Sequence, residues 1–226
     1  MQNGIAVSRR QLGGVPILHT SVLILAGLLA LDCAQVATQL ATQKALDNAV
    51  VIDSALSFDD ALKGQRLPPS IKRRLRLVNV RYYSFDGRLH QGQLVIHKDL
   101  KQSIVAIFGE LKDHRFPIAK VVPMSKYNYD DEASMLDNNT SAFNYRTVEG
   151  RRVLSQHALG RAIDINPFQN PIIERGGSRP RGAQYEPQAK GTIVINGLVV
   201  RAFLKRGWKW GGAWKTKKDY QHFEKP

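Results

Sequence analysis

The longest uninterrupted apolar stretch of the chain runs from Val22 to Leu31 and follows the pair Arg9 and Arg10. A run of this length is too short to span a bilayer alone but suits the apolar core of a signal peptide. Counted over 15–34 the segment could just span, with the arginines keeping the amino-terminal end cytoplasmic. We therefore expect residues 1–34 to form a signal peptide or an uncleaved membrane anchor; a buried helix of a soluble protein is the alternative.

Residues 35–69 show apolar positions at mixed helical spacings and end at a Pro-Pro pair, which predicts a helical or loosely ordered spacer. Beyond it, residues 70–226 alternate short apolar strands with segments of helical period. The patterns predict strands at 71–81, 90–97 and 119–123, helices at 101–111 and 199–206, and a long loop at 167–192. This order predicts an α+β fold, with a small, mainly antiparallel sheet that carries the functional site and helices that flank it.

The composition adds a strong basic character. The chain has 33 Lys and Arg against 19 Asp and Glu, a formal net charge of +14, which favours an anionic partner. No helix-turn-helix, RNP-like or zinc-finger pattern accompanies that charge, so no specific nucleic acid is expected. The single cysteine, Cys33, leaves any metal site to His, Asp and Glu. The acidic run at 130–132 lacks the spacing and the glycine of an EF-hand and indicates a solvated loop.

Two of the six histidines stand in an unusual setting. His157 and Asp164 lie seven positions apart among small and apolar residues, and His222 follows a segment rich in Trp and Gly. Asp164 is flanked by isoleucines and needs a partner, because burying an unpaired charge is costly. Two histidines and one carboxylate suit a catalytic zinc with one open position. Asp219, three residues before His222, can serve as a general base, or it can be a surface acid paired with a neighbouring lysine.

These residues carry a resemblance to a known family. The strings SQHALGRAIDINP (155–167) and WKWGGAWKTKKDYQHFE (208–224) resemble the two metal motifs of the M15 metallopeptidases, S-x-H-x-x-G-x-A-x-D and [DE]-x-x-H-[FW]. The string NNTSAFNYR (138–146) resembles the family's segment that ends in an active-site arginine. The resemblance covers about residues 70–226 with the motifs in family order. It implies an M15 or hedgehog-type peptidase core as the catalytic domain.

The resemblance also implies a complete site of zinc ligands, general base, carbonyl clamp and supporting residues. The implied zinc ligands are His157, Asp164 and His222, the implied general base is Asp219, and the implied carbonyl clamp is Arg146. The implied supporting residues are Ser155, Gly160, Asn144 and Glu224. Gly160 is expected to allow a tight backbone approach near the metal. Glu224 is expected to orient a metal ligand or to be solvated. The three tryptophans are expected to line the core and the pocket wall.

The implied activity is zinc-dependent hydrolysis of peptide bonds in peptidoglycan stem peptides. In this family the base is Glu in the D-alanyl-D-alanine dipeptidase branch and commonly Asp in the L-alanyl-D-glutamate endopeptidase branch, so Asp219 favours the endopeptidase. A D-alanyl-D-alanine carboxypeptidase is the alternative within the family. A non-catalytic zinc-containing module that binds the cell wall is the alternative of another class. We expect peptidoglycan peptides and an anionic cell wall or membrane surface as partners, and a periplasmic or extracytoplasmic place in the cell envelope.

Overall fold

A computed structural model describes residues 34–42 and 49–226 of the chain, which divides into two units, 1–47 and 48–226. In the first unit, residues 34–42 are helical, and the hydroxyls of Thr38 and Thr42 donate to carbonyl oxygens one turn earlier. The apolar segment expected to be a signal peptide or anchor lies, up to residue 33, outside the described residues. Within the described ranges, no helix is both long and apolar enough to cross a membrane.

The second unit mixes short strands with short helices, in agreement with the predicted α+β class. Its strands are β1 (Val51–Ile52), β2 (Leu75–Tyr83), β3 (Leu89–His97), β4 (Lys120–Val121), β5 (Asn139–Thr140), β6 (Ala162–Asp164), β7 (Ile172–Glu174), β8 (Gly177–Arg179), β9 (Lys209–Trp210), β10 (Lys218–Asp219) and β11 (His222–Glu224). Its α-helices are α2 (Phe58–Ala61), α3 (Pro69–Lys72), α4 (Lys101–Asp113), α5 (Asp131–Leu136) and α6 (Leu198–Leu204). Four 3₁₀ turns join them: η1 (Lys98–Leu100), η2 (Met124–Tyr127), η3 (His157–Leu159) and η4 (Gly211–Ala213).

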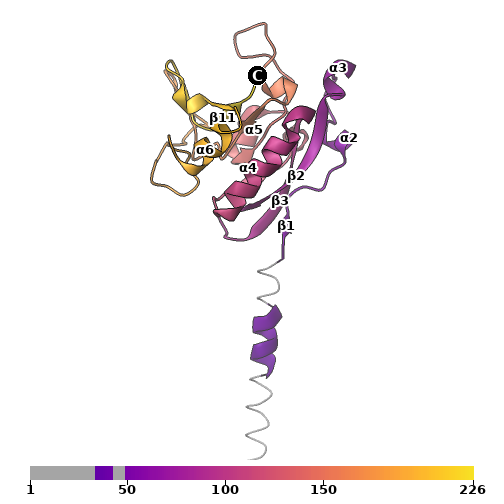
Figure 1. The fold of residues 1–226 in the computed structure, drawn as a ribbon, viewed down its shortest axis with the longest axis vertical. Helices are drawn as coiled ribbons and strands as arrows, with labels where there is room; N and C mark the ends of the chain where they lie inside the picture. Colours follow the sequence, from indigo (N-terminus) through magenta and orange to yellow (C-terminus); the bar gives the residue numbers. More distant parts are fainter. Residues whose placement is uncertain (1–33, 43–48) are drawn as a thin grey trace, which may run out of the picture. The chain divides into compact units, whose positions relative to one another are not determined.

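A long hairpin of β2 and β3 forms the base of the unit, and α4 packs along it (Figure 1). The four apolar positions whose spacing predicted a helix at 101–111 are buried in α4: Ile104, Ile107, Phe108 and Leu111. Their spacing of three and four residues puts them on one face, toward the sheet. The strand predicted at 71–81 begins only at Leu75, because the Pro-Pro pair before it starts the short helix α3.

Part of the predicted spacer belongs to the compact unit. Strand β1 pairs in parallel with β3, which gives the sheet the order β1-β3-β2. The amide group of Gln93 in β3 accepts hydrogen bonds from the Ser54 hydroxyl and the Leu56 N–H, both at 2.7 Å. Because these bonds and the β1 pairing fix the chain against the hairpin, residues 49–69 are part of the domain that we expected to begin at residue 70.

Two segments expected to be loops contain regular structure. The acidic run at 130–132 starts a helix: the Asp130 side chain accepts from the backbone N–H groups of Glu132 and Ala133 and caps α5. The segment 167–192 contains the β7–β8 hairpin, and β10 adds to it in the order β10-β7-β8. A capping carboxylate and a three-residue strand carry too little periodicity for the apolar pattern to reveal them.

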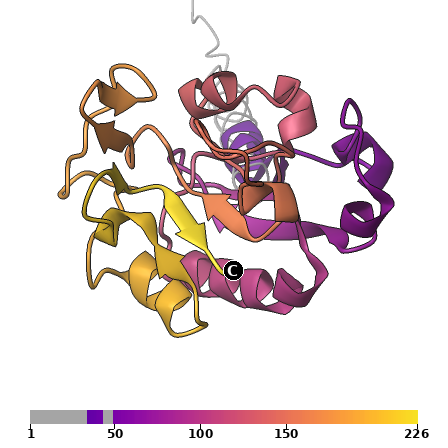
Figure 2. The same ribbon diagram turned by 90° about the horizontal axis from the view of Figure 1, so that it is seen from above.

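The strands that carry the candidate site form a third sheet in the order β6-β11-β9. Figure 2 shows β11 (yellow) beside β6 (orange), above α4 and α6. Phe223 of β11 is fully buried and stacks on Phe203 of α6 with ring centroids 4.0 Å apart, and Trp208 meets Phe203 edge-on. Trp208 and Trp210 are therefore core residues, as expected of the tryptophans, and this aromatic cluster fixes β11 on the helices.

A buried asparagine clamps the chain just after β6. The side-chain oxygen of Asn166 accepts from Ala119 N–H at 2.9 Å, and its amide donates to the carbonyl oxygens of Pro117 (2.8 Å) and Gly191 (3.1 Å). Asn166 is fully buried and has a positive φ of 47°. Its three bonds tie together three segments that are remote in sequence and hold the end of the strand that carries Asp164.

Replacing this clamp should destabilise the domain strongly. We expect Asn166→Ala to lower the free energy of unfolding by about 3 kcal/mol, because it leaves the Ala119 N–H and the Pro117 carbonyl without these partners, although the Gly191 carbonyl keeps its bond from Asn170. Asn196→Ala is the matched control, since Asn196 also has a positive φ (60°) but is exposed; it should cost only about 1 kcal/mol. Urea unfolding of both variants measures the difference, and equal losses would show that backbone strain, not the buried bonds, sets the cost.

Candidate metal centre

Two of the predicted ligands face each other across paired strands. Strands β6 and β11 are antiparallel, and Asp164 is the direct cross-strand partner of His222. Side chains at directly opposed positions project from the same face of a sheet, about 5 Å apart at Cβ. The Asp164 backbone is also bonded on its other side, since its N–H and C=O both pair with Ser141. The register of the sheet therefore sets the distance between these two ligands.

The third ligand is held by a tight turn. His157 begins η3, and its backbone N–H donates to the Ser155 hydroxyl at 3.2 Å. Its ring Nδ1 lies 2.5 Å from the Ala142 carbonyl oxygen. A carbonyl can only accept, so Nδ1 carries the proton and donates it, and Nε2 is left with a bare lone pair. His157 is thus fixed in the tautomer that a metal ligand requires.

The three candidate ligand atoms converge. His157 Nε2 lies 3.2 Å from His222 Nδ1 and 3.2 Å from Asp164 Oδ2, and His222 Nδ1 lies 2.9 Å from Asp164 Oδ1. All three residues belong to one group that could hold a metal ion. Ligands about 2.1 Å from a tetrahedral zinc stand about 3.4 Å apart, only slightly farther than these atoms. Two neutral nitrogens and one carboxylate oxygen at this spacing fit such an ion.

The other ring nitrogen of His222, Nε2, also has a partner. His222 Nε2 lies 3.4 Å from a carboxylate oxygen of Glu224, two residues along the same strand. Donation of the Nε2 proton to Glu224 leaves Nδ1 for the shared centre. Trp214 covers His222, with ring centroids 5.3 Å apart, and forms part of the wall, as expected. Of the two readings for Glu224, the contact with a ligand ring is the one that the structure shows.

The electrostatics of the group call for a cation. Burial alone would raise the pKa of Asp164, but the charges of His157 and His222 and their hydrogen bonds hold that pKa well below its usual value. Burial alone would lower the pKa of His222, but its hydrogen bonds to Asp164 and Glu224 raise it to about 10. Without an ion, a proton on His222 therefore balances the buried carboxylates. A divalent cation at the same point can replace it.

Asp219 lies beside this group and is buried. It is 7% exposed, and its Oδ1 is buried without a hydrogen-bond partner among the described residues. Its Oδ2 is 3.9 Å from Lys217 Nζ, which is too long for a hydrogen bond. Burial raises the pKa of Asp219, and the positive charge of His222 opposes that rise. A Cβ on Gly211 would come within 2.7 Å of the Asp219 carbonyl oxygen and 3.2 Å of His222 Cβ, so only glycine fits where η4 passes both.

Arg146 and Asn144 meet on an acid that the sequence pattern did not single out. The Arg146 Nε contacts one oxygen of Asp131, and the Asn144 amide donates to the other at 2.8 Å. The backbones of Asn144 and Arg146 are bonded to the segment that carries His157, through His157 and Ser155. Asp131 lies in the segment expected to be a solvated loop, but from the first turn of α5 it orients both residues.

The role expected of Gly160 needs a correction. Gly160 has a φ of 65°, and a Cβ there would come within 2.7 Å of His97 N and of Leu75. Its carbonyl accepts from His97 N–H at 2.8 Å. The close approach is therefore to the end of β3 and to the hydrophobic core, where the chain leaves η3 in the left-handed conformation.

Comparison with known families agrees with this geometry. Residues 149–225 match a family model of M15 peptidases described as D-alanyl-D-alanine carboxypeptidase. This part of the chain is therefore similar to M15 peptidases. The M15 match contains His157, Asp164, Asp219, His222 and Glu224, whereas the segment 138–146 precedes it. Comparison with curated proteins and with solved structures gives no match.

The contact between Glu224 and His222 gives a test of the metal centre. We expect Glu224→Ala to weaken zinc binding by about 10-fold to 100-fold, because the His222 ring loses the group that fixes its orientation and tautomer. Glu224→Gln should weaken it less, since the amide oxygen still accepts. Competition with a chromogenic chelator measures the affinity. Glu186→Ala, which removes an exposed carboxylate, is the control; equal affinity of the Glu224→Ala and Glu186→Ala proteins would contradict the assignment.

Proposed function

We propose that this chain is a zinc-dependent peptidase that cleaves stem peptides of peptidoglycan, with the L-alanyl-D-glutamate bond as its target. The supporting observation is the convergence of two imidazole nitrogens and a carboxylate oxygen, drawn from two remote segments, within 4.8 Å of one another. The M15 match over the same residues supports peptidase chemistry. The ring nitrogens that face away are both occupied, which is the arrangement that fixed metal ligands need.

The chain's residues have separate tasks in this proposal. Zinc held by His157, Asp164 and His222 would supply Lewis-acid chemistry, lowering the pKa of water to about 7 and polarising the scissile carbonyl. Asp219 takes the proton of the attacking water through its free carboxylate oxygen. It then returns that proton to the nitrogen of the leaving amine. A base is not needed merely to hold a metal, so Asp219 argues against the alternative of a non-catalytic wall-binding module.

Arg146 is proposed to bind the carbonyl oxygen as negative charge develops on it. Its side chain is 38% exposed, and its guanidinium keeps donors beyond the Nε that contacts Asp131. Such preorganised donors stabilise the transition state because they need no rearrangement when the charge forms. Asp131 and Asn144 fix the direction of the side chain in this proposal.

The identity of the general base, Asp rather than Glu, bears on which bond is cut. Asp219 favours the endopeptidase, because an aspartate base is common in that branch of the family. The description of the matching family model favours a D-alanyl-D-alanine carboxypeptidase instead, which makes that activity the second candidate. Digestion of purified peptidoglycan followed by mass spectrometry separates them: the first releases fragments cut after L-alanine, the second releases only terminal D-alanine.

We further propose that the protein works in the cell envelope, outside the cytoplasmic membrane. A stem-peptide substrate lies there, and the net charge of +14 suits an anionic wall or membrane surface. The expected amino-terminal signal or anchor would bring the domain to that compartment. Comparing the mature amino terminus with Met1 by mass spectrometry distinguishes cleavage from anchoring.

The division of labour between base and ligands gives the central prediction. Asp219→Asn should keep zinc but lower kcat by about 10²-fold to 10⁴-fold, because it removes proton transfer and leaves the ligands intact. His157→Ala should lose both zinc and activity. Metal analysis of each purified variant, with product release from peptidoglycan, measures both effects. If Asp219→Asn releases the same fragments at the wild-type rate, the proposed mechanism is wrong.

The contact between Asp131 and Arg146 gives a second prediction. Asp131→Asn should lower kcat about tenfold with an unchanged zinc content, because Arg146 loses the charge that orients it. Arg146→Ala should lower kcat by about 10²-fold or more. Glu132→Gln is the matched control, since it removes a neighbouring charge on the same helix that pairs with Arg179 instead. Equal kcat for the Asp131→Asn and Glu132→Gln proteins would show that Asp131 has no part in the reaction.

A further inference from the structure

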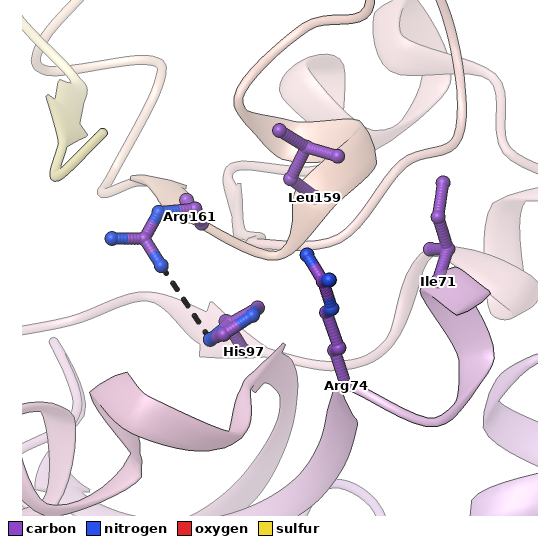
Figure 3. A pocket seen from close by; sticks show the side chains of 5 residues that line it. All are labelled: Ile71, Arg74, His97, Leu159 and Arg161. Atoms are coloured by element: carbon purple, nitrogen blue, oxygen red, sulfur yellow. Dashed lines mark hydrogen bonds between the residues drawn. The ribbon is translucent and has the colours of Figure 1, made fainter.

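A cavity lies beside the segment that carries His157 and Asp164. It has a volume of about 250 Å³ and is lined by Ile71, Arg74, His97, Leu159 and Arg161. Figure 3 shows the His97 ring between the guanidinium groups of Arg74 and Arg161, with Leu159 and Ile71 on the remaining sides. None of these side chains belongs to the metal centre, so the activity proposed above leaves the cavity without a role.

Two arginines bring positive charge to this cavity. Arg161 is held by backbone oxygens: its Nε donates to Lys225 O at 2.8 Å and its Nη2 to Pro226 O at 2.9 Å. The Lys225 carbonyl orients the guanidinium without neutralising it, whereas Pro226 O belongs to the α-carboxylate of the last residue in the sequence and balances part of the charge. Within the described part of the chain, neither Arg161 nor Arg74 forms an ion pair with an Asp or Glu side chain. Two cations facing one cavity repel each other unless an anion lies between them.

His97 adds a directed donor. Burial and the nearby charges of Arg161 and Arg74 lower the pKa of His97, although the exposed carboxylate of Asp99, 3.5 Å away, opposes them. The imidazole is therefore neutral near pH 7. Its Nδ1 accepts from the Asp99 N–H at 3.3 Å and faces Arg161 Nη1 at 3.5 Å. The proton then sits on Nε2, which is free to donate to a ligand.

The donors come from three different elements, which fits a tetrahedral anion better than a planar one. Arg74 stands just before β2, His97 ends β3, and Arg161 stands just before β6. A carboxylate presents two oxygens in one plane, whereas a phosphate presents oxygens in several directions. Ile71 and Leu159 offer an apolar wall for carbon atoms. We propose that this cavity is a binding site for the phosphate group of a phosphate ester, separate from the metal centre.

The backbone connects this cavity to the candidate metal centre. Leu159 and Arg161 lie between the ligands His157 and Asp164, and His97 N–H donates to the carbonyl of Gly160 in the same segment. A ligand held by Arg161 and His97 therefore contacts the segment between His157 and Asp164 and also the end of β3 that is bonded to it. Binding itself does not depend on the proposed peptidase reaction, so the two proposals can fail independently.

The test is equilibrium binding to the full-length protein in a non-ionic detergent at fixed ionic strength. Glycerol 3-phosphate is the probe, with inorganic phosphate and acetate as comparisons, measured by calorimetry. We expect saturable binding of one glycerol 3-phosphate per chain, weakened about tenfold or more by Arg74→Gln and abolished by Arg74→Glu. Arg74 is exposed, so its loss should leave the unfolding midpoint unchanged.

The matched controls are Arg73→Gln and Arg73→Glu, because Arg73 is also exposed, adjacent in sequence and absent from the cavity lining. Both should bind glycerol 3-phosphate within about twofold of wild type, because a screened charge outside the site contributes little. Equal losses for Arg73→Gln and Arg74→Gln would overturn the proposal, since general attraction by a basic protein would explain them.

Tighter binding of acetate or inorganic phosphate than of the ester would also overturn it. Binding to phosphatidylglycerol vesicles that needs Arg74 would support a lipid ester, and binding of the soluble probe alone would support a soluble or polymeric ester.

Discussion

The pairing of Asp164 with His222 across β6 and β11 is the constraint on which the rest of the site depends. Alternate residues of a strand face opposite sides, so a slip of one position would turn one ligand away from the other. The stacking of Phe203 on Phe223 holds β11 on α6, and the Asn166 clamp holds the chain just after β6. These contacts stabilise the fold, and by fixing the register they also fix the distance between two ligand atoms.

The same geometry explains why the site tolerates so much buried charge. Asp164, Asp219 and Glu224 surround two histidines in a region where an unbalanced carboxylate would be costly. Each His ring turns one nitrogen toward a fixed acceptor and the other toward the centre. The acids therefore do three different things: one meets the centre, one orients a ring, and one keeps an oxygen free. That division follows from where each side chain points, since the three acids lie on three short strands, β6, β10 and β11.

The sequence predicted the parts of this arrangement that are local. The spacing of apolar residues in α4 and the His–Asp pair around Gly160 are visible within a dozen positions, because each depends on one helix turn or one short motif. The contact of Asp131 with Arg146 was missed, since fifteen positions separate two residues whose meeting depends on how α5 packs. Strand β1 was missed for a similar reason: Val51–Ile52 is too short for a pattern and is defined only by its partner.

Gly160 lies between the residues that form the candidate metal centre and those that line the cavity. Its left-handed backbone ends η3 and turns the chain into β6, so that His157 and Asp164 face the acid-rich centre while Leu159 and Arg161 line the cavity. A side chain at this position would collide with the end of β3 and would disturb both sites together. Negative charge collects at the centre and positive charge at the cavity within eight residues. The overall charge of +14 therefore describes neither site: a cation is favoured at the first and an anion at the second, and the short turn between them keeps the two separate.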